Sequence, residues 1–256
     1  MPHSLELTTA LRAAERAGEI ARALYRHNLE VTVKADKSPV TEADVRCEQA
    51  IREVLEERFP TYGFYGEETG GHEMDADNIW LVDPLDGTKS FVRECPFFST
   101  QIALLRAGQL VLGVSCASAY GETAWAERGG GALLDGQPLQ VSGVKQLGAA
   151  ILSTGNLKTL AASSADWLRF GALVGRVNRL RGYGDFLHYH LLARGALDAV
   201  LESDVNILDI AALSVIVREA GGMVTDLAGR ELGLDTTSIL ATNGALHAPI
   251  LDALRR

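Results

Sequence analysis

Cysteine is scarce in this sequence, and the few cysteines show no spacing typical of a disulfide framework or a metal site. The 256 residues contain three, Cys47, Cys95 and Cys116. Their number is odd, and no C-x-x-C pair or Cys/His spacing is present. The pattern argues against a disulfide-stapled scaffold and favours a reducing compartment, so we expect a cytoplasmic protein.

The sequence also lacks an excess of basic residues and any long apolar run. Its 24 lysines and arginines stand against 33 aspartates and glutamates, which gives a formal net charge of −9. That sign is unfavourable for binding the phosphate backbone of a nucleic acid. Charged residues interrupt the apolar ones throughout residues 1–20, so neither a signal peptide nor a membrane span is predicted there. We expect neither nucleic acid nor a membrane as a partner.

Apolar residues, by contrast, are plentiful enough for a large packed core. Hydrophobic residues make up 47% of the chain and charged residues 22%, a composition typical of globular proteins. The length corresponds to one large domain or two sub-domains. Residues 1–144 predict helices followed by an antiparallel sheet over about 101–127, whereas residues 145–256 alternate strands and helices. We therefore place a boundary near residue 144, between an α+β sub-domain and an α/β sub-domain.

Two amphipathic helices are predicted near the start of the chain. Apolar residues recur at three- and four-residue steps over residues 7–24. A second helix is expected after Thr41, which can cap it, and Asp44 lies three residues later in the position of a capping-box acid. Pro60 is expected to end this helix.

The most informative stretch is W-L-V-D-P-L-D-G-T-K-S-F at residues 80–91. An apolar strand is predicted to stop at Asp83, and a proline-bearing turn directs Asp83 and Asp86 into one space. Two carboxylates so close repel each other unless a divalent cation compensates their charge. Gly87 permits close approach to an anion, and a helix starting at Thr88 would offer N–H groups to a phosphate. The ordinary alternative is an Asx-turn followed by a helix cap.

Further acids elsewhere in the chain complete a possible metal site. Glu67 and Glu68 lie in a glycine-flanked loop that, if it returns beside the strand end, adds a third carboxylate; a solvated loop is the alternative. Asp209 precedes an apolar helix, where simple N-capping would also explain it. A two-cation site that handles a dianion needs several acids. The four candidates, Glu67, Asp83, Asp86 and Asp209, suit two Mg²⁺ ions.

Four ordered motifs resemble those of the inositol monophosphatase superfamily of Mg²⁺-dependent phosphatases. They are K-A-D-K-S-P-V-T-E-A-D at 34–44, G-E-E at 66–68, D-P-L-D-G-T at 83–88, and D-I-A-A-L with E-A-G-G at 209–222. The resemblance covers nearly the whole chain. It implies an α+β fold, the layered αβαβα sandwich of the inositol monophosphatase and fructose-1,6-bisphosphatase type, and a homodimer.

The resemblance also implies which groups would bind the metals. One metal would be held by Glu67, Asp83 and the backbone carbonyl of Leu85. Another would be held by Asp83, Asp86 and Asp209. Glu68 and Asp44 would lie farther from the metals.

The same resemblance implies an activated-water mechanism without a phosphoenzyme. Thr88 would position the water and pass its proton toward Asp44 or Glu67. The N–H groups of Gly87 and Thr88 would hold the phosphate. The family usually has an aromatic residue just before its last aspartate, and this chain has Leu208 there, so the substrate-side wall is expected to differ.

The substrate is suggested by motifs that resemble the histidinol-phosphatase branch, R-G-Y-G-D-F at 181–186 and T-K-S-F at 88–91. Asp185 could pair with the ammonium or imidazole group of histidinol phosphate, and Arg181 could reach its phosphate. A helix N-cap for Asp185 and a solvent-exposed strand end for Arg181 are the structural alternatives. We predict a histidinol-phosphate phosphatase of histidine biosynthesis.

Other functions stay open. An inositol-1-monophosphatase or a broad small-molecule phosphatase is the nearest alternative, and a non-catalytic regulatory homologue is a more distant one. A cysteine nucleophile is disfavoured because no cysteine lies in a phosphate loop. His188 and His190 are expected to pack or to face solvent rather than to bind metal.

Overall fold

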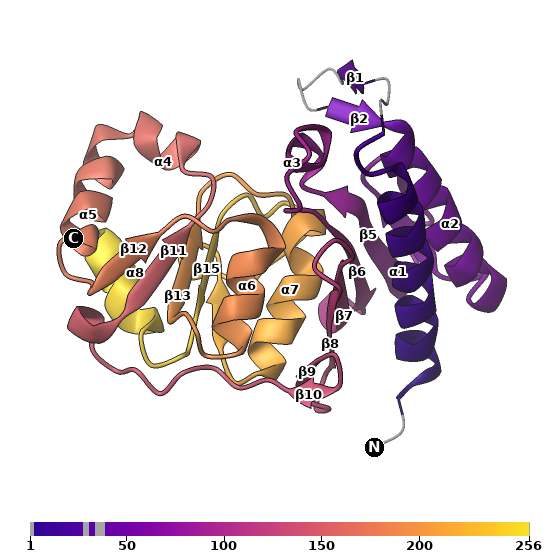
Figure 1. Cartoon of the computed structure of the whole chain (residues 1–256). Coiled ribbons are helices and arrows are strands. Elements are labelled where there is room, and N and C mark those ends of the chain that lie inside the picture. The colour runs from indigo at the N-terminus through magenta and orange to yellow at the C-terminus, as the bar shows by residue number, and fades with distance from the viewer. Residues whose placement is uncertain (1–2, 28–30, 34–38, 256) are drawn as a thin grey trace.

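The computed structural model describes residues 3–27, 31–33 and 39–255 of the chain. Within them, the elements stack as helices, sheet, helices, sheet and helices, which Figure 1 shows from right to left. This is the layered αβαβα sandwich that the sequence resemblance implies. Residues 34–38, part of the motif at 34–44, lie outside the described residues.

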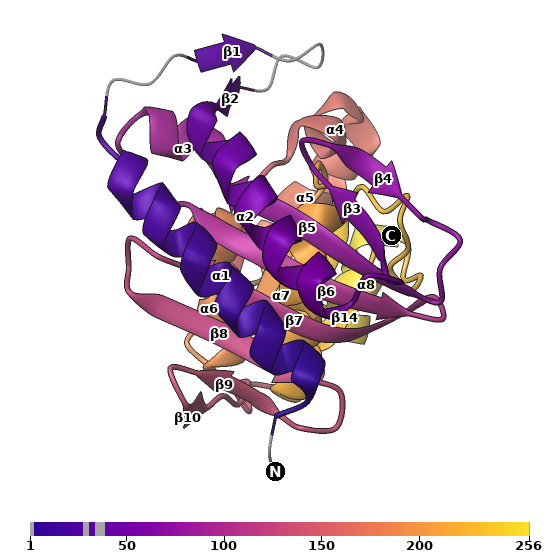
Figure 2. The same ribbon diagram turned by 90° about the vertical axis from the view of Figure 1, so that its right-hand side faces the viewer.

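The first layer consists of α1 (Leu5–Leu24) and α2 (Glu42–Arg58), which lie side by side across one face of the large sheet (Figure 2). A small two-stranded sheet of β1 (Val31–Val33) and β2 (Pro39–Thr41) precedes α2. The predicted capping box is confirmed: Thr41 Oγ1 accepts the Ala43 N–H at 3.1 Å, and Asp44 Oδ2 accepts the Thr41 N–H at 2.7 Å. The first turn of α2 therefore holds Asp44 in a defined orientation.

Eight strands form the large sheet, in the order β10, β9, β8, β7, β6, β5, β3, β4. They are β3 (Gly63–Gly66), β4 (Gly70–His72), β5 (Asn78–Asp86), β6 (Ser99–Arg106), β7 (Gln109–Ala117), β8 (Glu122–Glu127), β9 (Ala132–Leu134) and β10 (Gln137–Pro138). The predicted meander is confirmed, because β6, β7 and β8 pair antiparallel. The prediction that β5 stops at Asp83 is wrong. Its pairing with β6 shifts register after Asp83 and resumes at Asp86, so a single irregular strand carries both aspartates.

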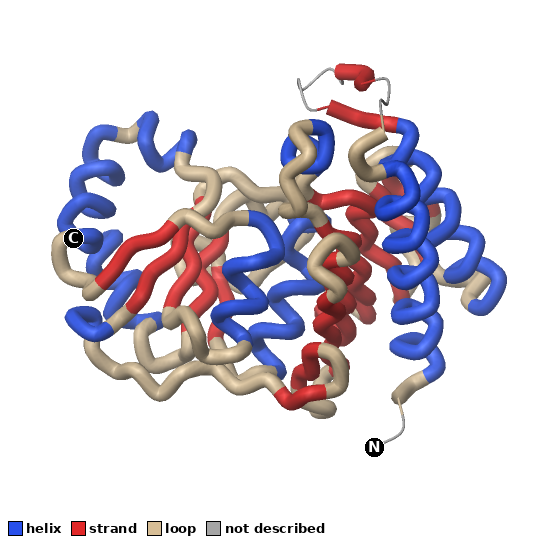
Figure 3. Tube along the Cα trace, in the orientation of Figure 1, coloured by secondary structure: helices blue, strands red, loops and turns tan. Residues whose placement is uncertain are grey.

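The middle layer consists of α6 (Asp185–Ala193) and α7 (Ile207–Glu219), which stand between the two sheets (Figure 3). Their apolar side chains form one core with the facing sides of both sheets. The helix and the large sheet approach closely at Gly113 of β7, where a Cβ atom would lie 2.3 Å from the carbonyl oxygen of Ala212. This contact holds α7, and with it Asp209 in its first turn, against the sheet.

The second sheet has five strands in the order β12, β11, β13, β15, β14. They are β11 (Ile151–Thr154), β12 (Arg179–Arg181), β13 (Ala199–Glu202), β14 (Met223–Thr225) and β15 (Ile239–Thr242). Its outer face packs against α4 (Lys158–Ala162), α5 (Ser164–Val174) and α8 (His247–Arg255). A 3₁₀ turn at Leu147–Ala149 leads into β11, and the short α3 (Thr88–Val92) follows β5.

The two sheets fall on either side of residue 144, the large one within residues 63–138 and the second within 151–242. Helix α7 packs on β6 and β7 of the large sheet and also on β14 and β15 of the second sheet, so it joins the two halves. A division into two sub-domains near residue 144 stays a prediction. Among the described residues, no helix combines the length and apolar character needed to cross a membrane.

We expect Gly113→Ala to lower the free energy of unfolding by about 1–3 kcal/mol, because the new methyl group collides with the backbone of α7. Urea unfolding measures the change. Gly148→Ala is the control, since nothing lies within 4 Å of a Cβ atom at that position. Unchanged stability of the Gly113 variant would contradict the close approach of helix and sheet.

Candidate functional site

Three aspartates from two distant parts of the chain meet between the end of β5 and the start of α7. One carboxylate oxygen from each of Asp83, Asp86 and Asp209 lies within 4.8 Å of the others. Asp209 is the third residue of α7, and its Oδ2 accepts the N–H of Asn206 at 3.0 Å. Asn206 is the N-cap of the helix, and Asp209 completes the capping box with it, so the helix-capping alternative is partly correct. The predicted convergence of these three acids is confirmed.

Local hydrogen bonds hold the irregular end of β5, which carries Asp83 and Asp86, in a defined conformation. Asp83 Oδ1 accepts the N–H of Leu85 at 2.9 Å, and Thr100 Oγ1 donates to the carbonyl of Pro84 at 2.9 Å. Gly87 follows with φ +90°, and a Cβ atom there would lie 2.4 Å from the carbonyl oxygen of Phe97. Only glycine fits this turn, which leads directly into the first turn of α3.

The electrostatics of the cluster call for a cation. Burial, together with the charges of neighbouring acids, raises the pKa of Asp83 and that of Asp86 well above their ordinary values. Burial likewise raises the pKa of Asp209 to about 7, with Glu67 among the contributing charges. Buried carboxylates that repel one another are stabilised by a bound divalent cation. A donor set made only of oxygen atoms fits a hard cation such as Mg²⁺.

Glu67 lies near this cluster, since its charge raises the pKa of both Asp83 and Asp209. Its N–H donates to the carbonyl of Val82 at 3.1 Å, which ties the loop to β5. Thus the loop does return beside the strand end, as predicted. A metal-binding role for Glu67 stays a prediction.

Glu48 holds that loop from α2, and sequence reasoning missed it. Its carboxylate accepts the N–H groups of Glu68 at 2.8 Å and of Thr69 at 2.9 Å. Glu48 is almost completely buried, and a Cβ atom on Gly66 would collide with it at 2.4 Å. The available signal was the pair Asp44 and Glu48, two acids four residues apart on a helix face that is otherwise apolar.

Thr88 and Asp44 are directly joined. The Thr88 hydroxyl lies 2.8 Å from Asp44 Oδ1 and 3.1 Å from the carbonyl of Leu85. The other oxygen of Asp44 accepts hydrogen bonds from the N–H and the hydroxyl of Thr41, both at 2.7 Å. Asp44 is therefore held as an acceptor for Thr88. The Leu85 carbonyl points toward the Thr88 hydroxyl. A metal-binding role for this carbonyl stays a prediction.

Asp185 stands at the first position of α6 with φ +45°, a left-handed conformation that aspartate tolerates. The N-cap alternative is wrong, because Gly184 occupies the cap position and no side-chain cap bond is present there. Its charge contributes to the raised pKa of Asp86, so it lies near the cluster. Burial and the charge of Glu202 raise the pKa of Asp185 itself.

Glu202, at the end of β13, is a second acid that sequence reasoning missed. It accepts hydrogen bonds from the Tyr189 hydroxyl at 2.7 Å and the Asn156 N–H at 3.1 Å, and it lies 3.2 Å from His188 Nε2. Burial opposes its charge, but the hydrogen bonds from His188 and Tyr189 give a lowered pKa overall. No motif marked it, because its partners are brought together only by the fold.

Arg181, His188 and His190 are not part of the acidic cluster. Arg181 lies exposed on the edge strand β12, and its guanidinium donates to the Leu180 carbonyl at 2.9 Å, so the structure does not link it to the cluster. His188 and His190 are both fully buried, which agrees with packing rather than solvent exposure. Neither joins the group of metal-competent side chains found among the described residues.

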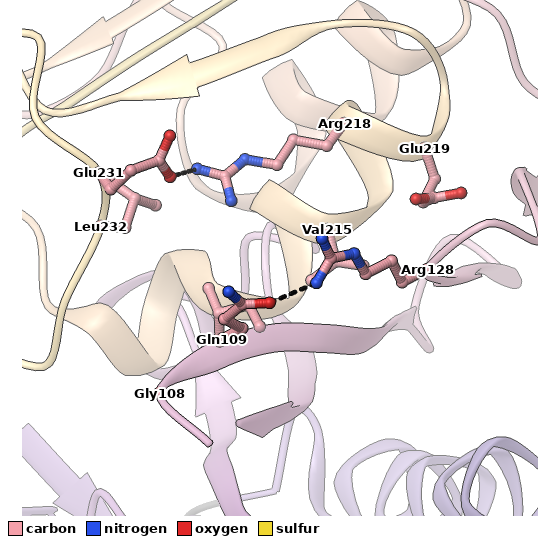
Figure 4. Close-up of a pocket in the computed structure, with 9 residues that line it drawn as sticks. Gly108, Gln109, Arg128, Val215, Arg218, Glu219, Glu231 and Leu232 are labelled. Carbon is pink, nitrogen blue, oxygen red and sulfur yellow. Dashed lines mark hydrogen bonds and ion pairs between the residues drawn. The ribbon is translucent and has the colours of Figure 1, made fainter. Parts of the chain in front are cut away.

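A separate cavity of about 480 Å³ lies between the β6–β7 hairpin and the end of α7 (Figure 4). The described residues that line it include none of the predicted site residues. Its charged groups are paired with neighbours, such as Arg218 with Glu231 at 2.6 Å and Arg128 with Gln109. We assign it no part in the site.

Comparison with known proteins identifies close similarities. The model of the inositol monophosphatase family matches residues 4–256. The chain is 42% identical to a histidinol-phosphatase of Mycobacterium tuberculosis, with 97% of each chain covered. It is 34% identical to an inositol-1-monophosphatase of Mesorhizobium japonicum, with 100% of this chain and 98% of the relative covered. A solved structure of an extragenic suppressor protein from Bartonella henselae superposes with a TM-score of 0.91 at 31% identity, over 99% of each chain.

We expect Asp86→Asn to abolish most of the increase in melting temperature that Mg²⁺ gives, because the site loses one charged ligand. Without Mg²⁺ the same variant should melt higher than the parent, since repulsion within the cluster is relieved. Thermal unfolding with and without Mg²⁺ measures both effects. Asp166→Asn, at an exposed position of α5, is the control. Identical Mg²⁺ responses of Asp86→Asn and the parent would exclude this site.

The stability of the metal-free protein should fall as pH rises from about 4 to 7. Unfolded Asp209 ionises near its ordinary value of 3.8, whereas in the folded protein its pKa is about 7, so the folded state binds more protons in this window. Mg²⁺ competes with those protons, and its stabilising effect should be larger at pH 8 than at pH 5. Melting temperatures across this range test both trends. A Mg²⁺ effect independent of pH would contradict binding at these carboxylates.

Proposed function

The chain belongs to the inositol monophosphatase family, and on that premise we propose that it is a Mg²⁺-dependent phosphate monoester hydrolase acting on L-histidinol phosphate. The products are L-histidinol and phosphate, and the reaction is a step of histidine biosynthesis. The choice of substrate rests on Asp185, a half-buried acid near the carboxylate cluster, at the start of α6. The higher identity to a histidinol-phosphatase than to an inositol-1-monophosphatase supports the same choice.

The acidic cluster is the phosphate end of this site. The groups that would hold Mg²⁺ are Glu67, Asp83, the Leu85 carbonyl, Asp86 and Asp209. Mg²⁺ bound there supplies positive charge to the phosphoryl oxygens and makes water a stronger nucleophile. The N–H groups of Gly87 and Thr88 bind the phosphate from the turn after β5.

Thr88 and Asp44 orient the attacking water and receive its proton. The Thr88 hydroxyl accepts a hydrogen bond from the water while it donates to Asp44 Oδ1. The water then attacks phosphorus as the bond to the leaving alkoxide breaks on the opposite side. The proton of the water passes through Thr88 to Asp44, and the alkoxide takes a proton from solvent water to give L-histidinol. Of the two predicted proton acceptors, Asp44 and Glu67, this 2.8 Å hydrogen bond supports Asp44.

Asp185 and Glu202 lie near the cluster, and we place them on the side of the site that receives the rest of the substrate. Hydrogen bonds from His188 and Tyr189 favour the anionic form of Glu202. The mutual repulsion of Glu202 and Asp185 is relieved by a cationic group placed beside them. Histidinol phosphate carries an ammonium group, whereas inositol offers only hydroxyl groups. The pair therefore favours the amino alcohol phosphate.

The broader predictions belong to the same proposal. We place the enzyme in the cytoplasm as a homodimer. All the acids proposed for the metals are present, as is Thr88, which argues against a non-catalytic homologue. Inositol 1-phosphate is the competing substrate to be tested.

We expect kcat/KM for histidinol phosphate to exceed that for inositol 1-phosphate. Asp185→Asn should raise KM for histidinol phosphate about 10-fold, the effect of losing one charge-assisted hydrogen bond, and should leave inositol 1-phosphate hydrolysis nearly unchanged. Mg²⁺-dependent phosphate release measures both. Asp166→Asn is again the control.

A preference for inositol 1-phosphate would reverse the proposed choice of substrate. Full activity in the presence of a chelator would overturn the metal requirement.

A further inference from the structure

A row of buried polar side chains leads from Asp86 into the core between the large sheet and α6. It consists of Ser99 and Gln101 on β6, Ser115 on β7 and His190 on α6, each at most 1% exposed. Asp86 is the register partner of Ser99, and Gln101 is the register partner of Ser115. These strand residues therefore share one face of the sheet. We call the four residues the polar row.

The polar row is continuously hydrogen-bonded. Gln101 Nε2 lies 2.7 Å from Ser99 Oγ and 3.0 Å from Ser115 Oγ, and it donates to both. The Ser99 hydroxyl in turn lies 3.4 Å from Asp86 Oδ2. At the other end, Ser115 Oγ lies 2.9 Å from His190 Nε2.

Gln101 donates to both serines of the polar row, and Ser99 donates onward to Asp86. Because the Ser99 oxygen accepts from Gln101, its hydroxyl hydrogen is directed to Asp86. Ser115 Oγ is also hydrogen-bonded to His190 Nε2, and the other ring nitrogen of His190 lies 3.5 Å from Glu122 Oε2. Burial lowers the pKa of His190, which favours the neutral ring. The row thus begins at the Asp86 carboxylate and ends at His190, and the amide nitrogen of Gln101 orients the Ser99 hydroxyl.

Packing alone does not account for the row. The next residue of β6 on the same face, Ala103, belongs to the apolar core. A hydrophobic residue at Gln101 would fill the same space without burying polar groups. Moreover, the side-chain carbonyl oxygen of Gln101 has no hydrogen-bond partner among the described residues. A buried acceptor without a partner lowers the stability of the folded state, so Gln101 is not there for stability alone.

We propose that Gln101 and Ser99 are positioning residues for the metal ligand Asp86. The inference rests on the proposed function, because it takes Asp86 as a Mg²⁺ ligand. A carboxylate that binds a cation must be held in a fixed plane, and a hydrogen bond from behind achieves this. Gln101 acts one step away, by preventing the Ser99 hydroxyl from turning elsewhere. Nothing in this role requires a proton to move along the row.

The test compares the Mg²⁺ affinity of full-length variants by titration calorimetry. Ser99→Ala and Gln101→Leu should each weaken Mg²⁺ binding about 10-fold, the lower end of the effect seen when the partner of a metal ligand is removed. Ser115→Ala, one step farther from Asp86, should have a smaller effect. Ser214→Ala is the matched control, because that buried hydroxyl bonds only to the Ala211 carbonyl of its own helix among the contacts described.

The outcomes separate the two proposals. If Asp86→Asn binds Mg²⁺ as the parent does, both the metal site and the positioning role fail. If Asp86→Asn loses binding while Ser99→Ala and Gln101→Leu keep the parent affinity, only the positioning role is wrong. An equal loss in Ser214→Ala would also overturn it, since the effect would then be general to buried serines. Melting temperatures without Mg²⁺ should be similar for Ser99→Ala and Ser214→Ala.

Discussion

Repulsion among buried carboxylates is the constraint on which the rest of this structure depends. The end of β5 carries Asp83 and Asp86, and the start of α7 carries Asp209. These carboxylates lie close enough together to bind one ion, although the two segments are more than a hundred residues apart in sequence. Burial and the charges of neighbouring acids raise the pKa of all three, so three negative charges there need compensation. The surrounding hydrogen bonds and glycine turns serve to keep these groups together despite that repulsion.

The locally encoded parts of the site were predictable from sequence. The capping box that orients Asp44 and the turn after β5 are short-range features with recognisable residue types. The path of β5 between Asp83 and Asp86 was not, because a register shift depends on the partner strand rather than on the strand itself. The roles of Glu48 and Glu202 were missed for a similar reason: their partners come from distant segments.

The two ends of the site differ in how strongly sequence indicates them. At the carboxylate cluster, several acids and glycines occur together, so their motif is specific to the family. At the other end, Asp185 could equally have been a helix cap until the structure placed Gly184 there. Sequence reasoning therefore reached the class of chemistry more securely than the substrate, and the substrate remains a proposal.

The position of α7 has a consequence for how such an enzyme can diversify. Asp209 lies in the first turn of α7, which packs between the two sheets. At Gly113 the backbones of α7 and β7 are so close that no side chain fits between them. Shifting that aspartate would require repacking of the entire interior. Asp185, by contrast, is the first residue of α6 and is only half-buried. On the proposed role of Asp185, new substrate preferences can arise by exchanging the residues around the start of α6, while the carboxylate cluster stays unchanged.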